Sequence, residues 1–521
     1  MDTPRSPKRP LETPIGPVYT DPSALQACLV YPNTYYTGMS SLAVHTLYSL
    51  LNEGYGISCE RCFLPENQPL KQMLRSDETL RSLEANTPLG GFDLLAVTTS
   101  FELDWLKLPL MLKMGGVPCM QHQRTDHDPF IIGGGPCFTA NPAPVLDIFD
   151  AVYIGEIEPV VPHLRRLAEL PRKQWREYLG ECEGIVCTES PDPVSRRCAP
   201  DINEFLTETA LLTSDTEFAD CYLTELGRGC GRGCSFCLAG QIYRPVRMRR
   251  PETIVEAVKA ILPHTTRVGL IAPTLSDYPW LDELSEMLLD MSPRPTVSVS
   301  SLRADGNNEG IFRVLAASGR QSVTFAPETG SEDFRRTIGK TLTDEELFDG
   351  ISGALEAGLK AVKLYFLVGL PGETEADRSA IPELITRLIR QFPDCRFTAS
   401  VSPFVPKPHT LFEAVGVPDY RTMRGHLKTV RRELQEIGSV EVRTASARWA
   451  AVQTAISRGD RRLGEALVEA SLTRADFSHT ASFFAVAGHD LEAAAGEVMV
   501  PADEYPWSFI DPSCSDLRGG R

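Results

Sequence analysis

Three closely spaced cysteines constrain this chain more than any other feature of its sequence. Cys230, Cys234 and Cys237 follow the spacing C-x3-C-x2-C, and the glycine-rich residues 227–233 surround the first of them. Thiolates are the usual ligands of iron–sulfur clusters, and glycine lets a backbone come close to such a cluster. A [4Fe–4S] cluster has four irons, and this loop supplies three ligands. The spacing therefore predicts a cluster whose fourth iron is open to another ligand.

Two other interpretations of these cysteines stay open on the sequence. A structural zinc site usually has four protein ligands, and the nearest further cysteine, Cys221, lies in a run typical of a buried strand. The three cysteines could also be buried free thiols. The ligand count and the spacing favour the cluster.

The motif is similar to the signature of the radical S-adenosylmethionine (SAM) superfamily, in which an aromatic residue, here Phe236, precedes the last cysteine. The resemblance implies that the amino and carboxylate groups of SAM chelate the open iron. It also implies that an electron from the cluster cleaves SAM to methionine and a 5′-deoxyadenosyl radical, which abstracts hydrogen from a substrate. A reductase, a flavodoxin or a ferredoxin is the implied electron donor.

Composition narrows the compartment and the partners. The net charge of −17 argues against a surface that binds nucleic acid non-specifically, and the basic run at residues 244–250 is expected to form salt bridges behind the cysteine loop. Fourteen cysteines in a long chain without a signal-peptide pattern favour a reducing cytoplasm over a disulfide scaffold. No apolar run approaches the ~20 residues that span a bilayer. We therefore expect a cytoplasmic protein with no membrane partner.

The first half of the chain alternates short apolar runs with helical patterns. Residues 1–20 are polar and rich in proline, which predicts a disordered arm. Residues 21–165 are predicted to form a Rossmann-like, doubly wound α/β domain with a parallel sheet. The glycines at 133–135 follow one apolar run, so a ligand could approach the backbone at that strand end. A charged connector without evident chemistry is expected over residues 166–215.

Upstream of a radical SAM core, this layout is similar to the cobalamin-binding domain of one large subfamily. The histidine motif D-x-H-x-x-G, which ligates cobalt in many cobalamin proteins, is absent; the nearest candidate, Asp126-His127-Asp128, is expected to be a solvated loop. Cobalamin binding stays open, the alternative being a domain that only packs against the core or shapes the substrate pocket. The stretches that match the subfamily are residues 31–33, 38–40, 59–65, 133–136, 141–144, 153–158 and 505–511.

Residues 216–420 are predicted to form a partial (β/α)6 barrel, the core of the radical SAM superfamily. Residues 297–301 and 397–402 alternate polar with apolar side chains, which predicts a solvated or ligand-filled lumen. Residues 421–521 are expected to form a helical region and tail. The six expected strands are residues 221–225, 268–272, 296–301, 322–326, 361–368 and 397–402.

Candidate cofactor-binding residues follow the expected strands, because barrel chemistry sits at strand carboxyl ends. By resemblance, Ser276 and Asp277 are the candidates for holding the amino group of SAM. Arg303 could pair with the SAM carboxylate, or else with Asp305. Glu328 could accept hydrogen bonds from ribose hydroxyls. Phe236 completes the predicted site, and no catalytic residue is assigned.

These features together predict a radical SAM enzyme with a [4Fe–4S] cluster on the three cysteines. If cobalamin binds the first domain, methyl transfer to an unactivated carbon is the expected reaction. One alternative is methylthiotransferase-like modification of RNA or protein. It would need a second three-cysteine cluster, whereas the N-terminal cysteines are scattered and only Cys59 and Cys62 form a C-x2-C pair. The other alternative is a non-catalytic iron–sulfur protein. The substrate stays unassigned.

Overall fold

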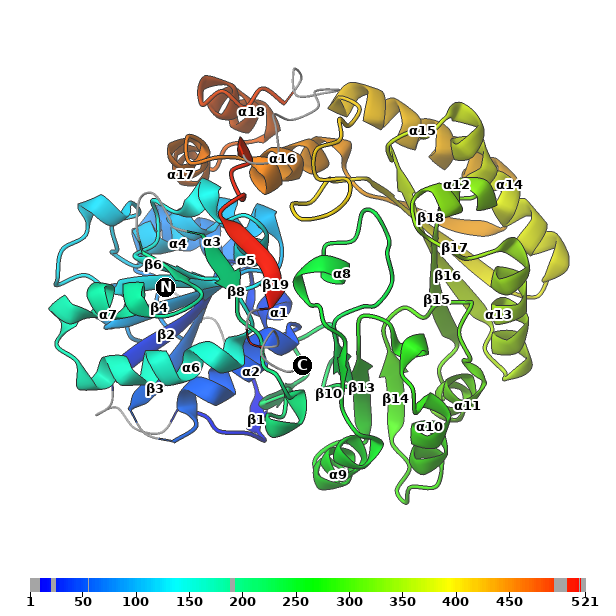
Figure 1. Ribbon diagram of the computed structural model, residues 1–521, viewed down its shortest axis with the longest axis horizontal. Helices are drawn as coiled ribbons and strands as arrows, with labels where there is room; N and C mark the ends of the chain where they lie inside the picture. Colours follow the sequence, from blue (N-terminus) through cyan, green and yellow to red (C-terminus); the bar gives the residue numbers. More distant parts are fainter. Residues whose placement is uncertain are drawn as a thin grey trace, which may run out of the picture. The chain divides into compact units, whose positions relative to one another are not determined.

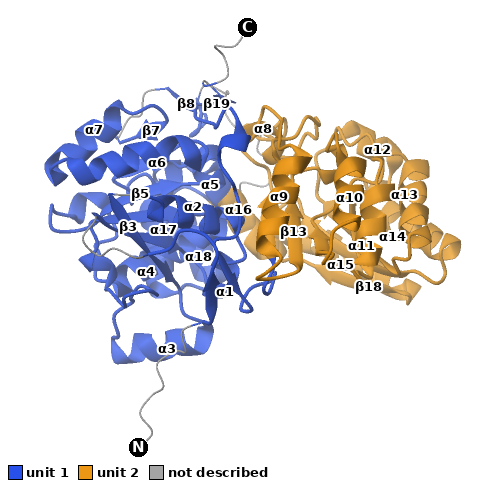
Figure 2. Ribbon diagram, turned by 90° about the horizontal axis from the view of Figure 1, so that it is seen from below, with its two compact units in different colours: residues 1–221, 456–489, 502–521 blue, residues 222–455, 490–501 orange. Residues whose placement is uncertain are grey.

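The computed structural model describes residues 10–19, 25–54, 56–187, 193–491, 504–514 and 516. The chain forms two compact units (Figure 1 and Figure 2). Unit 1 comprises residues 1–221, 456–489 and 502–521, and unit 2 comprises residues 222–455 and 490–501. Both units contain α-helices and parallel β-strands. The domain boundaries predicted at residues 165, 215 and 420 stay a prediction.

Unit 1 is built on a six-stranded sheet with the order β3-β2-β4-β5-β6-β7. All neighbours are parallel except the edge strand β7. β2 and β4 are buried along most or all of their length, as expected for strands covered on both faces. The sheet confirms the predicted doubly wound domain. Its strands are β2 (Leu25–Tyr31), β3 (Ile57–Phe63), β4 (Leu94–Thr98), β5 (Phe130–Gly134), β6 (Ala151–Tyr153) and β7 (Ile185–Val186).

Helices from distant parts of the chain complete unit 1. The Asn141 side chain donates to the backbone oxygens of Ser457 and Gly459, at 3.1 and 2.8 Å. Such contacts attach the helices near the C-terminus to this unit. The helices are α1 (Tyr35–Gly38), α2 (Leu42–Asn52), α3 (Asn67–Ser76), α4 (Leu108–Met114), α5 (Pro136–Ala140), α6 (Ile157–Arg166), α7 (Trp175–Glu181), α17 (Leu463–Thr473) and α18 (Phe477–Val486).

The predicted disordered arm is in part ordered. Residues 1–9 and 20 lie outside the described residues, but β1 (Glu12–Pro14) pairs antiparallel with β9 (Leu211–Thr213). The reason is electrostatic. The guanidinium of Arg61 is buried, and both carboxylate oxygens of Glu12 accept its hydrogen bonds at 2.7 Å. A buried charge needs such a partner, and the arm supplies it.

Unit 2 contains a row of parallel strands in two sheets, β10-β13-β14 and β15-β16-β17-β18. A bridge between Leu302 and Phe325 links the two sheets. Six strands correspond to the six predicted. The seventh, β18, falls in the region that was expected to be helical. The strands are β10 (Tyr222–Glu225), β13 (Arg267–Ile271), β14 (Thr296–Val299), β15 (Ser322–Glu328), β16 (Ala361–Val368), β17 (Arg396–Pro403) and β18 (Val440–Thr444).

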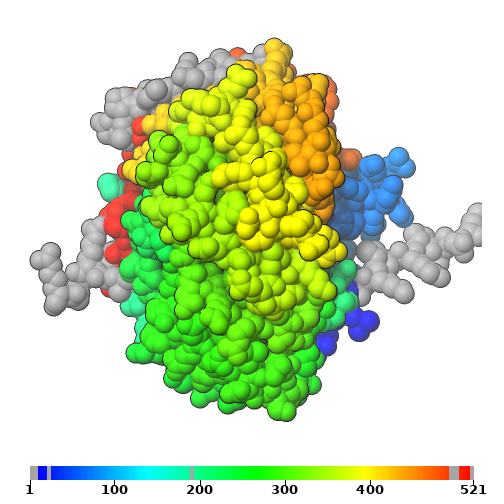
Figure 3. Space-filling view, turned by 90° about the vertical axis from the view of Figure 1, so that its right-hand side faces the viewer, coloured from blue at the N-terminus to red at the C-terminus, as the bar shows by residue number. Residues whose placement is uncertain are grey.

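The helices of unit 2 begin where the sequence provides caps. The Thr343 hydroxyl accepts from the Glu346 amide, and the Glu346 carboxylate accepts from the Thr343 amide, which completes a capping box. Helices line the outer side of the strand row in Figure 1, and Figure 3 views the surface they form. The helices of unit 2 are α8 (Ala239–Ile242), α9 (Pro251–Ile261), α10 (Leu281–Leu289), α11 (Glu309–Ala317), α12 (Glu332–Thr337), α13 (Asp344–Glu356), α14 (Glu375–Gln391), α15 (Tyr420–Ile437) and α16 (Ala447–Arg458).

The other face of these strands is accessible. Along β15, β16 and β17, alternate residues are buried, and the residues between them are half-buried or exposed. Tyr365, in the middle of β16, is 37% exposed. Side chains of described residues therefore do not fill this face, as the polar pattern of residues 397–402 predicted. The accessible side chains include Thr324, Lys363, Tyr365, Thr398, Ser400 and Ser402.

None of the described helices is long and apolar enough to cross a membrane.

Candidate active site

The three cysteines lie on one loop that directly follows β10 and the short strand β11 (Gly227–Arg228). Cys230 is buried, and Cys234 and Cys237 are half-buried. Burial raises the pKa of the Cys237 thiol, and the nearby thiols of Cys234 and Cys230 raise it further. The three cysteines thus lie within eight residues of one another on a single loop. Gly229, at φ +87°, is required here, because a Cβ would lie 2.3 Å from the Tyr243 oxygen.

The segment after α12 holds this loop in place. The Ser235 amide donates to the Ile338 oxygen at 3.0 Å. Gly339 has a φ of +73°, and a Cβ there would lie 2.5 Å from the Gly233 oxygen, so the two backbones are in close contact. The Phe236 side chain packs against an apolar cluster of Phe334, Ile338, Leu370 and Phe404. Phe236 therefore anchors the loop in the core.

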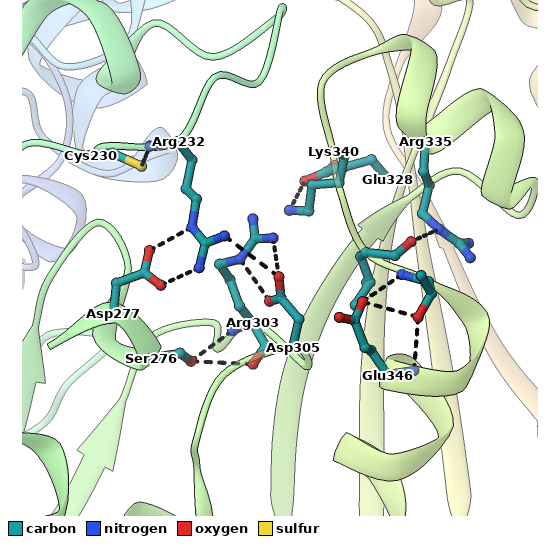
Figure 4. A network of polar contacts seen from close by, with 12 residues as sticks. Cys230, Arg232, Ser276, Asp277, Arg303, Asp305, Glu328, Arg335, Lys340 and Glu346 are labelled. Carbon is teal, nitrogen blue, oxygen red and sulfur yellow. Dashed lines mark hydrogen bonds and ion pairs between the residues drawn. The ribbon is translucent and has the colours of Figure 1, made fainter. Parts of the chain in front are cut away.

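Arg232, inside the loop, connects it to the ends of two strands (Figure 4). Its guanidinium donates to the Asp277 carboxylate at 2.5 and 3.0 Å and lies 3.8 Å from Asp305. Burial alone would raise the pKa of Asp277, but the Arg232 hydrogen bonds outweigh it and hold that pKa below its usual value. Asp277 follows β13, and Asp305 follows β14.

Ser276 and Arg303, both predicted cofactor ligands, lie side by side. The Ser276 hydroxyl accepts from the Arg303 amide at 3.0 Å. The Arg303 guanidinium donates to both oxygens of Asp305 at 2.6 and 2.8 Å, which is the alternative that the sequence left open. This pair uses two of the five guanidinium N–H donors, so donors for a ligand remain in principle.

Glu328 ends β15 in an unusual conformation. Its φ is +70°, a left-handed value that a residue with a side chain rarely adopts and that concentrates at functional sites. Burial raises the pKa of its carboxyl, and the Lys340 ammonium, 3.4 Å away, opposes that rise. Figure 4 shows Lys340 and Glu328 on the other side of the site from Arg232.

Lys340 was not predicted. It directly follows Gly339, so the contact that holds the cysteine loop also brings this ammonium to the site. Burial raises the pKa of the Cys234 thiol, and the positive charge of Lys340 opposes that rise. The sequence marks Lys340 only as a lysine beside a glycine shortly after the strand that ends at Glu328. This pattern is too common to identify Lys340 as a site residue.

The basic run at residues 244–250 supports the loop, as predicted. Arg244 donates to the Arg232 oxygen at 3.1 Å, and the fully buried Arg249 pairs with Glu225 at 3.2 Å. Burial would raise the pKa of Glu225, but Arg228 and Arg249 outweigh it and lower that pKa. The run is a structural support of the cysteine loop.

Family models match both units. One described as "Radical SAM proteins, N-terminal" matches residues 43–185, and one described as "Radical SAM superfamily" matches residues 224–385. The second match begins in β10 and includes the cysteine loop, α12 and the Glu328 strand.

Other proteins and solved structures are also similar to this chain. An uncharacterised protein of Methanocaldococcus jannaschii is 29% identical over 447 residues, 84% of this chain and 90% of that protein. The ribosomal protein uS12 methylthiotransferase RimO of Streptomyces griseus is 29% identical over 178 residues, 31% of this chain and 35% of that protein. The apo structure of the cobalamin-dependent SAM radical enzyme OxsB has a TM-score of 0.50 at 15% identity, covering 80% of this chain and 56% of that chain.

Proposed function

This chain belongs to the radical SAM superfamily of enzymes, and we propose that Cys230, Cys234 and Cys237 hold the [4Fe–4S] cluster of that family. The observation that carries the proposal is the loop itself, which places three cysteines within eight residues of one another after the carboxyl end of β10. The bound cluster supplies the electron that cleaves SAM and so begins radical chemistry on a substrate.

The polar residues around the loop are proposed to bind and orient SAM. The Arg303 guanidinium and the Lys340 ammonium favour a carboxylate between them, because both are largely buried and strengthen hydrogen bonds to an anion. Ser276 fixes the Arg303 backbone, and Arg232 fixes the cysteine loop against Asp277. Glu328 is placed to accept hydrogen bonds from hydroxyl groups of the ligand.

The accessible face of β15, β16 and β17 is proposed to bind the substrate. Ser400 pairs in register with Tyr365, and Thr398 pairs with Lys363, so hydroxyl groups, an aromatic ring and an ammonium lie together. The Lys363 ammonium lies 4.8 Å from the centre of the Tyr365 ring. Strand interiors of a packed sheet do not normally leave such side chains accessible, and a bound ligand would cover them.

Cobalamin-dependent methyl transfer is a second candidate. The likeness to OxsB concerns the fold alone, so the support comes from unit 1. β5 ends in glycines, and the hydroxyl of Thr99, buried after β4, has no hydrogen-bond partner among the described residues. This edge fits a bound ligand, which Thr99, Gly134 and Gly135 would hold. Bound cobalamin supplies a methyl carrier. The segments that follow these strands, residues 99–107 and 135–147, contain no histidine to ligate cobalt.

Methylthiotransferase-like chemistry has less support. The similarity to RimO covers 31% of this chain. Cys59 and Cys62, the C-x2-C pair of unit 1, lie three residues apart on β3, so their side chains point to opposite faces of the sheet and cannot hold one cluster. A second three-cysteine cluster in unit 1 is therefore not supported.

The test is reductive SAM cleavage. The full-length protein is reconstituted with iron and sulfide without oxygen, reduced with dithionite in place of the protein donor, and given SAM. We expect a cluster absorbance and 5′-deoxyadenosine by mass spectrometry. Cys234→Ala should lose both, whereas Cys395→Ala, a buried free cysteine elsewhere in unit 2, should keep both. Zinc at one per chain without a cluster, or a full cluster with intact SAM, would contradict the proposal.

The same sample separates the two candidates. Hydroxocobalamin is added before desalting, and its retention is read from the absorbance of the corrin. Retention by the wild type and loss in Thr99→Val with Gly135→Ala would favour methyl transfer. No retention would restrict the proposal to SAM cleavage without cobalamin.

A further inference from the structure

A disulfide in unit 1 joins two parts of the chain that are far apart in sequence. Cys198 and Cys514 are 316 residues apart, with their Cα atoms at 6.0 Å. All other cysteines of the described residues are free. We call residues 504–514 and 516 the C-terminal strap. Residues 510–514 of the strap run along β8 (Val194–Arg196), just before Cys198. In a chain whose composition favours free thiols, this one bond requires a function.

The strap is held by more than the disulfide. Its strand β19 (Ile510–Cys514) pairs parallel with β8, and the Arg196 guanidinium donates to the Pro512 oxygen at 2.9 Å. Asp516 forms an ion pair with Arg197 and accepts from the Cys198 amide at 2.9 Å. The side chain of Trp507 is 2% exposed. The strap is thus a packed element with its cysteine near one end.

The strap is attached to the carboxyl end of the unit 1 sheet. Arg197 bonds through its backbone to Ile154 and Glu156, the residues that follow β6, at 3.1 and 3.0 Å. The Glu156 carboxylate accepts from the buried Arg196 at 3.3 Å and from the Ala199 amide at 3.1 Å. Arg196 therefore bonds both to Pro512 of the strap and to Glu156, which follows β6.

The covered edge is the one where doubly wound sheets bind ligands. Tyr153, the last residue of β6, has a buried hydroxyl with no hydrogen-bond partner among the described residues. Gly155 has a φ of +150°, and a Cβ there would lie 2.5 Å from the Arg197 oxygen, so the segment before Cys198 fills the space beside this strand end. The strap holds this segment in place through the Asp516–Arg197 ion pair and the bond from the Cys198 amide. Release of the strap would therefore loosen the segment that covers the Tyr153 hydroxyl and the glycine.

We propose that Cys198 and Cys514 form a redox-operated clasp, which as a disulfide fixes the strap to β8 beside the end of β6 and releases the strap when a dithiol reduces the bond. One thiolate of the dithiol attacks the Cys514 sulfur, and Cys198 leaves as a thiolate that takes up a proton. The second thiol of the reductant then displaces Cys514, which is protonated in turn. Two electrons pass to the protein, and the reductant leaves as a disulfide.

Attack at Cys514 follows from its position. Cys198 is fully buried and lies between the Arg197 and Ala199 contacts, whereas Cys514 lies near the end of the strap and is 7% exposed. A small opening of that end exposes the Cys514 sulfur without disturbing β8. The clasp does not depend on the cysteine loop of unit 2, and its test uses neither iron nor SAM.

The first test counts thiols in the full-length protein. The protein is purified without reductant, labelled with N-ethylmaleimide under native conditions and then in urea, and digested for mass spectrometry. We expect the peptides of Cys198 and Cys514 to be unlabelled in urea, and both to be labelled after treatment with dithiothreitol. Cys187, a free cysteine of the same region, should be labelled in urea in both samples. Labelling of Cys198 and Cys514 before reduction would overturn the proposal.

The second test measures release of the strap. Chymotrypsin cuts after aromatic residues such as Trp507 and Phe509, and proteolysis of a transiently open segment follows its open population, so reduction should raise cleavage there by about tenfold. Cys514→Ser should be cut at the higher rate with or without reductant, and Cys187→Ser should behave as the wild type. Equal rates in oxidised and reduced wild type would overturn the clasp, and that comparison needs no variant.

A third measurement excludes a metal site. Cys198, Cys514 and Asp516 have ligand atoms within 4.8 Å of one another. Zinc at one per chain in the reduced wild type, retained in Cys234→Ala and lost in Cys514→Ser, would replace the clasp with a metal centre. We expect no zinc that depends on Cys514.

Discussion

Arg232 and Asp277 are 45 residues apart in sequence, and the guanidinium of the first donates to both carboxylate oxygens of the second. This pair fixes the loop that carries the three cysteines to the end of β13. Because Asp305 lies 3.8 Å from the same guanidinium and pairs with Arg303, the positions of the cysteines and of the predicted ligand Arg303 are coupled.

Arg232→Ala should lower cluster retention. Both side chains of the Arg232–Asp277 pair are partly exposed, so we expect a loss of about 1 kcal/mol in the free energy of unfolding and a larger loss of iron after desalting. Iron per chain and urea unfolding measure the two effects. The matched control is Arg313→Ala, which removes an exposed ion pair with Glu286 elsewhere in unit 2. Equal iron in both variants would show that Arg232 does not hold the loop.

Lys340→Met should destabilise the protein more at high pH than at low pH. It leaves the largely buried Glu328 without its cation, at a cost of about 3 kcal/mol when the carboxyl is charged. The pKa of Glu328 is already raised by burial, and loss of the cation raises it further. The free energy of unfolding of the variant is therefore highest while the Glu328 carboxyl is protonated. It falls as pH rises toward the pKa of Glu328 in the folded state.

The double variant Lys340→Met with Glu328→Gln is the control for this effect. It removes the buried charge and should recover most of the lost stability at pH 8, as urea unfolding at pH 5 and pH 8 would measure. A Lys340→Met variant with the same stability deficit at both values would contradict the pairing.

Ser400→Phe and Ala399→Phe should separate the two faces of β17. Ser400 lies on the accessible face, so a ring there should change the free energy of unfolding by only about 0.5 kcal/mol. Ala399 is fully buried against the other side, and the same ring should cost about 3 kcal/mol through overpacking. Denaturant unfolding compares them directly. Equal destabilisation would mean that side chains fill both faces.

Glu373 should make stability depend on pH near neutrality. Burial raises the pKa of its carboxyl to about 7, although the Gly369 amide and Arg378 favour the charged form. The folded state therefore binds this proton more tightly than the unfolded chain does. The contribution of Glu373 to the free energy of unfolding is fully present below the pKa of its carboxyl in the unfolded chain. It is lost as pH rises through the pKa of that carboxyl in the folded protein.

The comparison variant is Glu373→Gln. The difference in melting temperature between wild type and variant should shift against the wild type from about pH 5 to pH 7 and level off above that, because only the wild type titrates there. Parallel pH curves for the two proteins would show that Glu373 keeps the same proton affinity on unfolding.

The sequence predicted the strands of both units where their residues form largely apolar runs. β16 was predicted with its observed bounds, residues 361–368. β18 was missed because Glu441 and Arg443 alternate with its valines in a short edge strand whose charged side chains are exposed. The ordered part of the arm was missed because Glu12 pairs with Arg61 only after the chain has folded.

The sequence by itself determined the features that depend on near neighbours. The cysteine spacing, the capping box of Thr343 and the alternation of strand and helix all arise within a few residues. The tertiary structure alone decided which distant side chains meet. Lys340 reaches Glu328, Arg232 reaches Asp277, and Cys198 reaches Cys514 across 316 residues. The physical reason is that parallel strands bring their carboxyl ends to one edge, so side chains distant in sequence become neighbours there.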